Sequence, residues 1–235
     1  MSRVMKEETA QTTHFRVKYN HDCSRRKLQL VSRAPPMSIE DLHDYVKARI
    51  VHVAPVSNEI PLKVVERLRE KADWISLDSQ GLVRSFNGEG NLVFDSLIDK
   101  RILKLIDVYK STRHEIKCAT GVVNLKSAIR SVHDCGARIV LVTLGSKGAL
   151  LSTEEGTCKI PAYSPVRVVD PTGAGDVFTG AFLAESVRSK NATWCACVGS
   201  AAASLSVEVS GPANRIEKIE TYRRANILYE KQIKQ

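Results

Sequence analysis

The sequence predicts an α/β fold, in which β-strands and helices alternate along the chain. Short apolar segments at residues 50–54, 74–78, 106–109 and 138–143 have the length and composition of buried strands, and segments with helical spacing separate them. Such alternation is typical of a mainly parallel sheet. The chain has 235 residues, of which 43% are hydrophobic, so it can bury a large core without help from disulfides or metal ions.

The segment before this alternation has the pattern of a β-hairpin. Residues 12–19 and 27–33 alternate between polar and β-favouring apolar residues, and a run of turn-forming residues lies between them. Ala34-Pro35-Pro36 then ends the pattern, because proline interrupts a strand. We therefore expect two parts, a small β-sheet at residues 12–34 and an α/β core at residues 45–235.

Apolar residues recur at helical spacing after the first strand of the core, and they predict a helix over residues 60–72. Later segments have the same spacing, and one of them ends at Gly136, a residue type that favours helix ends. Further helices are expected at residues 97–105, 122–135, 174–187, 192–207 and 215–231.

Composition excludes several classes of protein. No apolar run approaches the ~20 residues that span a bilayer, and the first residues lack the apolar core of a secretory signal. The chain has only 13 glycines and 8 prolines, too few for a fibrous or low-complexity protein. We therefore expect a cytoplasmic protein with no membrane partner.

The charge balance gives a weaker indication. Lys and Arg number 35 against 26 Asp and Glu, and the net charge of +9 permits a polyanionic partner without demanding one. No long basic tract or aromatic–basic alternation is present, so we expect a generic basic surface or a small phosphorylated ligand and no nucleic acid. No C-x-x-C pair occurs, which favours reduced, mostly buried thiols and no direct metal site. The cysteines are Cys23, Cys118, Cys135, Cys158, Cys195 and Cys197.

The strongest motif is Asp-Pro-Thr-Gly-Ala-Gly-Asp at residues 170–176, which follows the β-rich stretch 166–169 and leads into an apolar helix. Its glycines let a ligand approach the backbone, and the free N–H groups and dipole of a helix start favour an anion. Asp176 in the first turn could accept the proton of a hydroxyl that attacks a phosphate. The alternative is an ordinary glycine turn in which Asp176 only stabilises the helix start.

Residues 170–178 resemble the C-terminal signature of the PfkB, or ribokinase-like, family of small-molecule kinases. The resemblance implies a Rossmann-type layered sheet with a small β lid, and ATP and Mg²⁺ as cofactors. It implies that Gly173, Ala174 and Gly175 form an anion hole and that Asp176 is the catalytic general base. It also allows a monovalent cation and a homodimer.

The turn Thr143-Leu144-Gly145-Ser146-Lys147-Gly148 resembles the family's strand and turn beside the ATP phosphates. The resemblance implies a nucleotide-binding role for five residues. An unspecialised hairpin and a solvated lysine are the alternatives. The five residues are Thr143, Gly145, Lys147, Gly148 and Thr172.

Thr112 and Glu115 resemble the family's Asn-x-x-Glu motif, which organises the metal-bound phosphate and its water shell. Threonine stands where asparagine is usual, and its hydroxyl can hold a water but cannot offer both an amide donor and a carbonyl acceptor. The two residues also have the spacing of a capping box at a helix start. Both roles can hold together.

Asp78, Gln80 and Arg84 resemble the family's Asp-x-Asn/Gln…Arg segment at a strand end. Ligands of open α/β sheets bind at the carboxyl ends of strands, so these residues are expected to contact substrate or phosphate, with Arg84 making a forked contact. The alternative is that Arg84 is an ordinary surface residue after a turn.

Other details resemble an inositol-kinase-like branch of the family: the hairpin as part of the lid, Arg-Arg-Lys-Leu in its second strand, and the two motifs above. The implied activity is phosphorylation of a hydroxyl of a cyclic polyol or sugar, with inositol first. A nucleoside kinase and a non-catalytic nucleotide-binding remnant are the alternatives. Full-length relatives begin with a strand and a Gly-Gly segment, and this sequence has neither of them before Thr12. We therefore expect an N-terminally truncated chain, which is a fragment, a chain with a misassigned start or a degenerate homologue. We expect this chain alone to bind nucleotide but to be a poor kinase.

Overall fold

The computed structural model describes residues 10–20, 26–42, 47–94, 98–211 and 216–233. The chain divides into two compact units, residues 1–137 and 138–235. Cys23 and most of the predicted hairpin turn lie outside the described residues. The division into a lid at residues 12–34 and a core from residue 45 stays a prediction.

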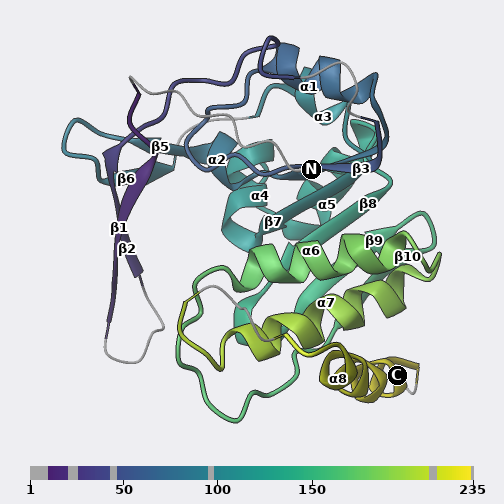
Figure 1. Ribbon diagram of the computed structural model, residues 1–235. Coiled ribbons are helices and arrows are strands. Elements are labelled where there is room, and N and C mark those ends of the chain that lie inside the picture. The colour runs from purple at the N-terminus through teal and green to yellow at the C-terminus, as the bar shows by residue number, and fades with distance from the viewer. Residues whose placement is uncertain (1–9, 21–25, 43–46, 95–97, 212–215, 234–235) are drawn as a thin grey trace. The chain divides into compact units, whose positions relative to one another are not determined.

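The first unit is built around three parallel strands in the order β3 (Ala48–Val53), β4 (Ala72–Asp78) and β7 (Val108–Thr112). Helix α1 (Leu62–Arg69) connects β3 to β4 and buries Val64, Val65 and Leu68 (Figure 1). The predicted alternation of strand and helix is therefore confirmed here. Because parallel strands are buried on both faces, they read as continuous apolar runs in the sequence.

The predicted N-terminal hairpin is confirmed, and the structure extends it. Strands β1 (His14–Tyr19) and β2 (Arg26–Ser32) pair antiparallel. A second hairpin, β5 (Arg84–Phe86) with β6 (Leu92–Phe94), adjoins them: the Leu30 N–H donates to the Gly90 carbonyl over 2.8 Å, and the rings of Phe15 and Phe86 lie 5.5 Å apart. Each strand of the second hairpin has three residues, too few for a period to be recognised.

The remaining helices of the first unit are short. Helix α2 (Gln80–Val83) precedes β5 directly, and α3 (Lys100–Leu103) precedes β7. After β7 come α4 (Arg113–Thr120) and α5 (Leu125–Asp134). We did not predict α4 as a separate helix. Its start is fixed by the capping box of Thr112 and Glu115, and Gly121 ends it in a left-handed conformation.

The second unit begins with an antiparallel sheet of β8 (Ile139–Thr143), β9 (Ala149–Thr153) and β10 (Gly156–Ile160). The turn η1 (Gly145–Lys147) joins β8 to β9. Only β8 was predicted as a strand. The β-rich stretch Val166–Val169 is irregular, with Val166 91% exposed, so its composition does not produce a strand here.

The three predicted C-terminal helices are confirmed as α6 (Ala174–Ser186), α7 (Ala192–Ser206) and α8 (Lys218–Ile233). Helices α6 and α7 pack closely: a Cβ on Gly199 would lie 2.8 Å from the Phe178 carbonyl oxygen. Helix α8 packs beside α7 (Figure 1), where the Tyr222 ring is stacked on Trp194 with centroids 6.0 Å apart. None of the described helices combines the length and apolar character that crossing a lipid bilayer requires.

Candidate functional site

The second unit carries the strongest motif at the start of α6. Gly173 occupies the N-cap position with φ +77°, a left-handed conformation that glycine adopts without strain. No described side chain caps this end, and the first turn of a helix leaves backbone N–H groups without intrahelical acceptors. The Ala174 N–H makes a long bond of 3.3 Å to the Pro171 carbonyl of the preceding turn. The segment leading to it is ordered by Asp170, whose carboxylate accepts a hydrogen bond from the Thr172 N–H over 2.9 Å. The arrangement provides backbone donors that could bind an anion.

Asp176 lies in that first turn and is exposed. A Cβ placed on Gly173 would be 3.9 Å from Asp176 Oδ2, so the carboxylate lies beside the backbone donors and does not point away from them. An exposed carboxylate next to an anion-binding helix start can accept a proton from a hydroxyl that approaches the bound anion. The predicted anion hole and the predicted base are thus neighbours.

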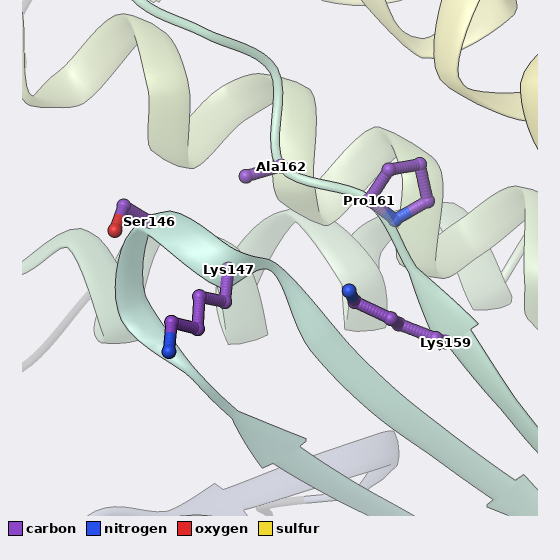
Figure 2. A pocket seen from close by; sticks show the side chains of 5 residues that line it. All are labelled: Ser146, Lys147, Lys159, Pro161 and Ala162. Carbon is purple, nitrogen blue, oxygen red and sulfur yellow. The ribbon is translucent and has the colours of Figure 1, made fainter.

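The turn after β8 borders a pocket of about 280 Å³ in the same unit (Figure 2). Ser146 and Lys147 of η1 line it, together with Lys159, Pro161 and Ala162 from the end of β10 and the following segment. Both lysines are exposed. Lys147 was among the predicted nucleotide-binding residues; Lys159 was missed, because only the pairing of β9 with β10 brings it beside the turn.

Gly148 holds this turn close to the end of β10. Its φ is +88°, and a Cβ there would lie 2.0 Å from the Ile160 carbonyl oxygen. The Leu144 N–H donates to the Gly148 carbonyl over 2.7 Å, which closes the turn. Glycine is therefore required at this position by both conformation and space.

In the first unit, the predicted site residues lie at the carboxyl ends of β4 and β7. Asp78 is fully buried; its Oδ1 accepts from the Gln80 N–H over 3.1 Å, and its Oδ2 accepts from Lys110 Nζ over 2.5 Å. In this geometry Asp78 acts as an internal acceptor that joins two strand ends. Direct contact between Asp78 and a substrate stays a prediction.

Arg84, Glu115 and Thr112 come together at the start of α4. The Arg84 Nη2 donates to Glu115 Oε1 over 2.9 Å, and the Thr112 N–H donates to Glu115 Oε2 over 2.8 Å. The Glu115 N–H donates to the Thr112 hydroxyl over 3.2 Å, which completes the capping box. Burial by itself raises the pKa of the Glu115 carboxyl, but Arg84, the Thr112 backbone and Lys110 together lower that pKa below its ordinary value.

These residues fit an indirect role toward Mg²⁺. Mg²⁺ binds through few carboxylates and keeps several of its own waters. Glu115 supplies one ionised carboxylate whose oxygens already accept protein hydrogen bonds, so it suits the hydration shell of the ion better than its inner sphere. Among the residues that the structure describes, no group of three or more His, Cys, Asp and Glu is arranged to hold a metal ion.

Lys110, which is only 4% exposed, was not among the predicted site residues. A signal was available, because a lysine inside a strand that is otherwise buried is unusual and calls for a charged partner. Its partner could not be identified from sequence, since Asp78 lies 32 residues away and only the register of β4 and β7 aligns the two.

The fold is α/β and carries candidate anion-binding positions, and comparison with known proteins identifies its family. Residues 4–219 match the family described as pfkB family carbohydrate kinase. The chain belongs to this family.

Among curated relatives, a cytidine kinase of Thermococcus kodakarensis is 30% identical over 66% of this chain and 54% of its own length. A ribokinase of Arabidopsis thaliana is 31% identical over 74% of this chain and 45% of its own length. An inositol 3-kinase of Oryza sativa subsp. japonica is 26% identical over 80% of this chain and 47% of its own length. The chain therefore spans about half the length of these relatives.

Solved structures agree with the ribokinase-like fold. A sulfate complex of a pyrophosphate-dependent kinase in the ribokinase family has a TM-score of 0.78 and 28% identity, covering 90% of this chain and 74% of that one. Another pyrophosphate-dependent kinase, complexed with a pyrophosphate analog and myo-inositol, has a TM-score of 0.73 and 29% identity over 83% and 70%. Arabidopsis thaliana ribokinase with ribose and ATP has a TM-score of 0.71 and 27% identity over 92% and 70%.

Proposed function

We propose that this chain carries the phosphoryl-transfer machinery of a kinase that phosphorylates a hydroxyl group of a small polyol or sugar. The observation that carries the proposal is the start of α6, where uncapped backbone donors adjoin the carboxylate of Asp176. The donors at Gly173, Ala174 and Gly175 stabilise the charge of the transferring phosphoryl group. Asp176 takes the proton of the attacking hydroxyl.

The first unit supplies a second set of groups. Arg84 presents a guanidinium that suits an oxygen of a phosphate, and Thr112 with Glu115 holds water near the phosphates. The hydrogen bond from the Gln80 N–H to Asp78 stabilises the carboxyl end of β4. Mg²⁺, when bound, neutralises charge on the phosphate oxygens of the donor.

A cyclic polyol such as inositol is the first acceptor to test. Support comes from the inositol 3-kinase relative and from the similar structure that contains myo-inositol. A nucleoside is the second candidate, because the cytidine kinase of Thermococcus kodakarensis and a nucleoside kinase of Methanocaldococcus jannaschii match with 30% and 31% identity. A non-catalytic nucleotide-binding protein is the third, and it predicts donor binding without turnover.

ATP is the first donor to test, because a similar structure, a ribokinase, is complexed with ATP. The residues proposed to lie along the ATP phosphates are Thr143, Gly145, Lys147, Gly148 and Thr172. Inorganic pyrophosphate is the second. The two lysines of one pocket repel each other unless an occupant carries negative charge, and the other lining residues are small. Two similar structures are pyrophosphate-dependent kinases.

The experiment tests purified chain with Mg²⁺, each donor in turn, and a panel of inositols, sugars and nucleosides. Asp176→Asn keeps the shape of the side chain and removes the base, and we expect turnover to fall by about 10²-fold or more. Donor affinity should change little, because the backbone donors remain. Glu155→Gln, an exposed carboxylate in the turn between β9 and β10, is the matched control for loss of one charge. Equal turnover in Asp176→Asn and Glu155→Gln would exclude Asp176 as the base.

A further inference from the structure

Four buried charged side chains form one cluster in the first unit, which we name the buried quartet: Asp78, Lys110, Arg84 and Glu115. Two ion pairs make it up. Lys110 Nζ lies 2.5 Å from Asp78 Oδ2, and Arg84 Nη2 lies 2.9 Å from Glu115 Oε1. The four side chains are 9% exposed or less, and their formal charges sum to zero.

Stability alone does not explain the pair of Lys110 and Asp78. Taking both ions out of water is costly, and replacing a buried ion pair by apolar residues is often neutral or stabilising. A buried ion pair of this kind is better explained by the backbone geometry that it holds in place. Lys110 is the third residue of β7, near its carboxyl end, opposite the last residue of β4. This is the edge of the sheet where ligands of α/β folds bind.

The pair fixes the path of the chain from Asp78 to Arg84. The Asp78 carboxylate accepts a hydrogen bond from the Gln80 N–H, and the Ser79 N–H donates to the Lys110 carbonyl over 3.0 Å. The Tyr109 hydroxyl donates to Ser79 Oγ over 2.9 Å. Helix α2 follows at once with a single turn and no described side-chain cap. Its end is Arg84, so the direction of the Arg84 side chain depends on these bonds.

Arg84 itself has a buried donor, Nε, that lacks an acceptor among the described residues, although Nη2 is bound to Glu115. A buried N–H without an acceptor is costly, so such groups call for a partner that is not part of the protein chain. A guanidinium edge matches a phosphate oxygen. This orphaned donor points to an anionic oxygen as its missing partner.

We propose that Lys110 is a positioning residue for a phosphate oxygen bound at this sheet edge of the first unit: paired with Asp78, it fixes the segment Asp78–Arg84 so that Arg84 presents its free Nε to that oxygen. This inference rests on the proposed function. It assigns Lys110 an action through Arg84, with no contact between Lys110 and substrate.

The test is a double-mutant cycle between Lys110→Met and Arg84→Gln. Each variant is measured for kcat and KM in phosphoryl transfer, and for its Kd for inorganic pyrophosphate by calorimetry, well below its Tm. We expect either substitution alone to lower kcat/KM by about 10²-fold, the scale of a small misplacement. The double variant should be scarcely worse than Arg84→Gln, because residues that act as one unit are not additive.

Two further variants separate positioning from folding. Asp78→Asn with Lys110→Met removes both charges, and it should recover most of the Tm lost by Lys110→Met while kcat/KM stays low. Arg69→Met breaks the ion pair between Arg69 and Asp107, which precedes β7 at its opposite end. That control should lower Tm and leave both kcat/KM and pyrophosphate affinity unchanged.

Additive losses of kcat/KM in the double-mutant cycle would overturn the positioning role. So would recovery of kcat/KM together with Tm when Asp78→Asn is combined with Lys110→Met. If the wild type transfers no phosphate to any acceptor, the proposed function fails. The pyrophosphate affinities still decide the inference: non-additive weakening by Lys110→Met and Arg84→Gln supports it, and unchanged affinity in either variant refutes it.

Discussion

At the scale of single residues, Glu115 shows how one side chain can serve both structure and chemistry. Its carboxylate caps α4, pairs with Arg84 and stays ionised although it is buried. The spacing of Thr112 and Glu115 predicted both a capping box and a role near phosphate. The structure confirms the capping box, and the role near phosphate stays a prediction.

The lowered pKa of Glu115 predicts a pH-dependent contribution to stability. A carboxyl whose pKa is lower in the folded chain than its ordinary value of 4.5 stabilises the fold above that pH, and the contribution is lost as the pH falls through the folded pKa. Glu115→Gln keeps the shape and breaks the buried pair, so we expect a loss of about 3–5 kcal/mol near neutral pH. The difference in unfolding free energy between wild type and variant should shrink below that pH.

Urea denaturation of both proteins across the acid range measures this difference. Glu89→Gln, an exposed carboxylate of the β5–β6 turn, is the control and should show a small difference at every pH. A wild-type advantage over Glu115→Gln that stays constant on acidification would show that the ionised form of Glu115 does not stabilise the fold.

At the scale of elements, the turn between β8 and β9 depends on two glycines with different requirements. Gly148 has φ +88° and no room for a Cβ, whereas Gly145 has φ +61° and no atom within 4 Å of a Cβ. Gly148 also has ψ −137°, outside the left-handed helical region, so crowding and a more demanding backbone conformation add at this position, whereas Gly145→Ala meets only a positive φ. This turn carries Lys147, so its geometry also decides where that ammonium group lies.

We expect Gly148→Ala to lower stability by about 1–3 kcal/mol more than Gly145→Ala, because the new Cβ collides with backbone that cannot move away alone. Gly145→Ala should cost only the ~1–2 kcal/mol of the left-handed conformation. Displacement of the turn should also weaken pyrophosphate binding in Gly148→Ala. Thermal unfolding and calorimetric titration of both variants measure these effects. Equal behaviour of the two variants would show that the turn tolerates a side chain at Gly148.

Elements with strong local signals were predictable, and those defined by distant partners were not. The segment 138–143 and the helices from residue 174 onward carry continuous apolar or periodic patterns, and the structure places β8, α6, α7 and α8 there. Strands β5 and β6 are too short to show a period. Lys110 and Lys159 gain their partners or neighbours only through strand register, which a local pattern does not contain.

At the scale of the whole molecule, each unit carries part of the predicted chemistry. The second unit holds the helix start proposed to bind an anion, Asp176 and the lysine pocket, and the first unit holds the buried quartet. Folding of the second unit can be followed through its own cysteines. Cys195 and Cys197 are buried in α7, and burial raises the pKa of each thiol to about 12.

A ligand of the second unit should therefore protect these two thiols from alkylation. At a pH of about 8, a thiol with such a pKa is thiolate only to roughly one part in 10⁴, so labelling requires unfolding that exposes the group. Pyrophosphate at about 100 times its Kd stabilises the native state by about 2.7 kcal/mol, which should slow labelling of Cys195 and Cys197 by about 10²-fold. Cys118, which is half-buried in the first unit, should be labelled early with and without ligand. Peptide mass spectrometry after timed iodoacetamide treatment resolves each cysteine.

Asp176→Asn should keep the protection, because it retains the backbone donors, and Gly148→Ala should lose much of it. Labelling of Cys195 and Cys197 at the same rate with and without pyrophosphate or ATP would show that neither donor binds the folded second unit.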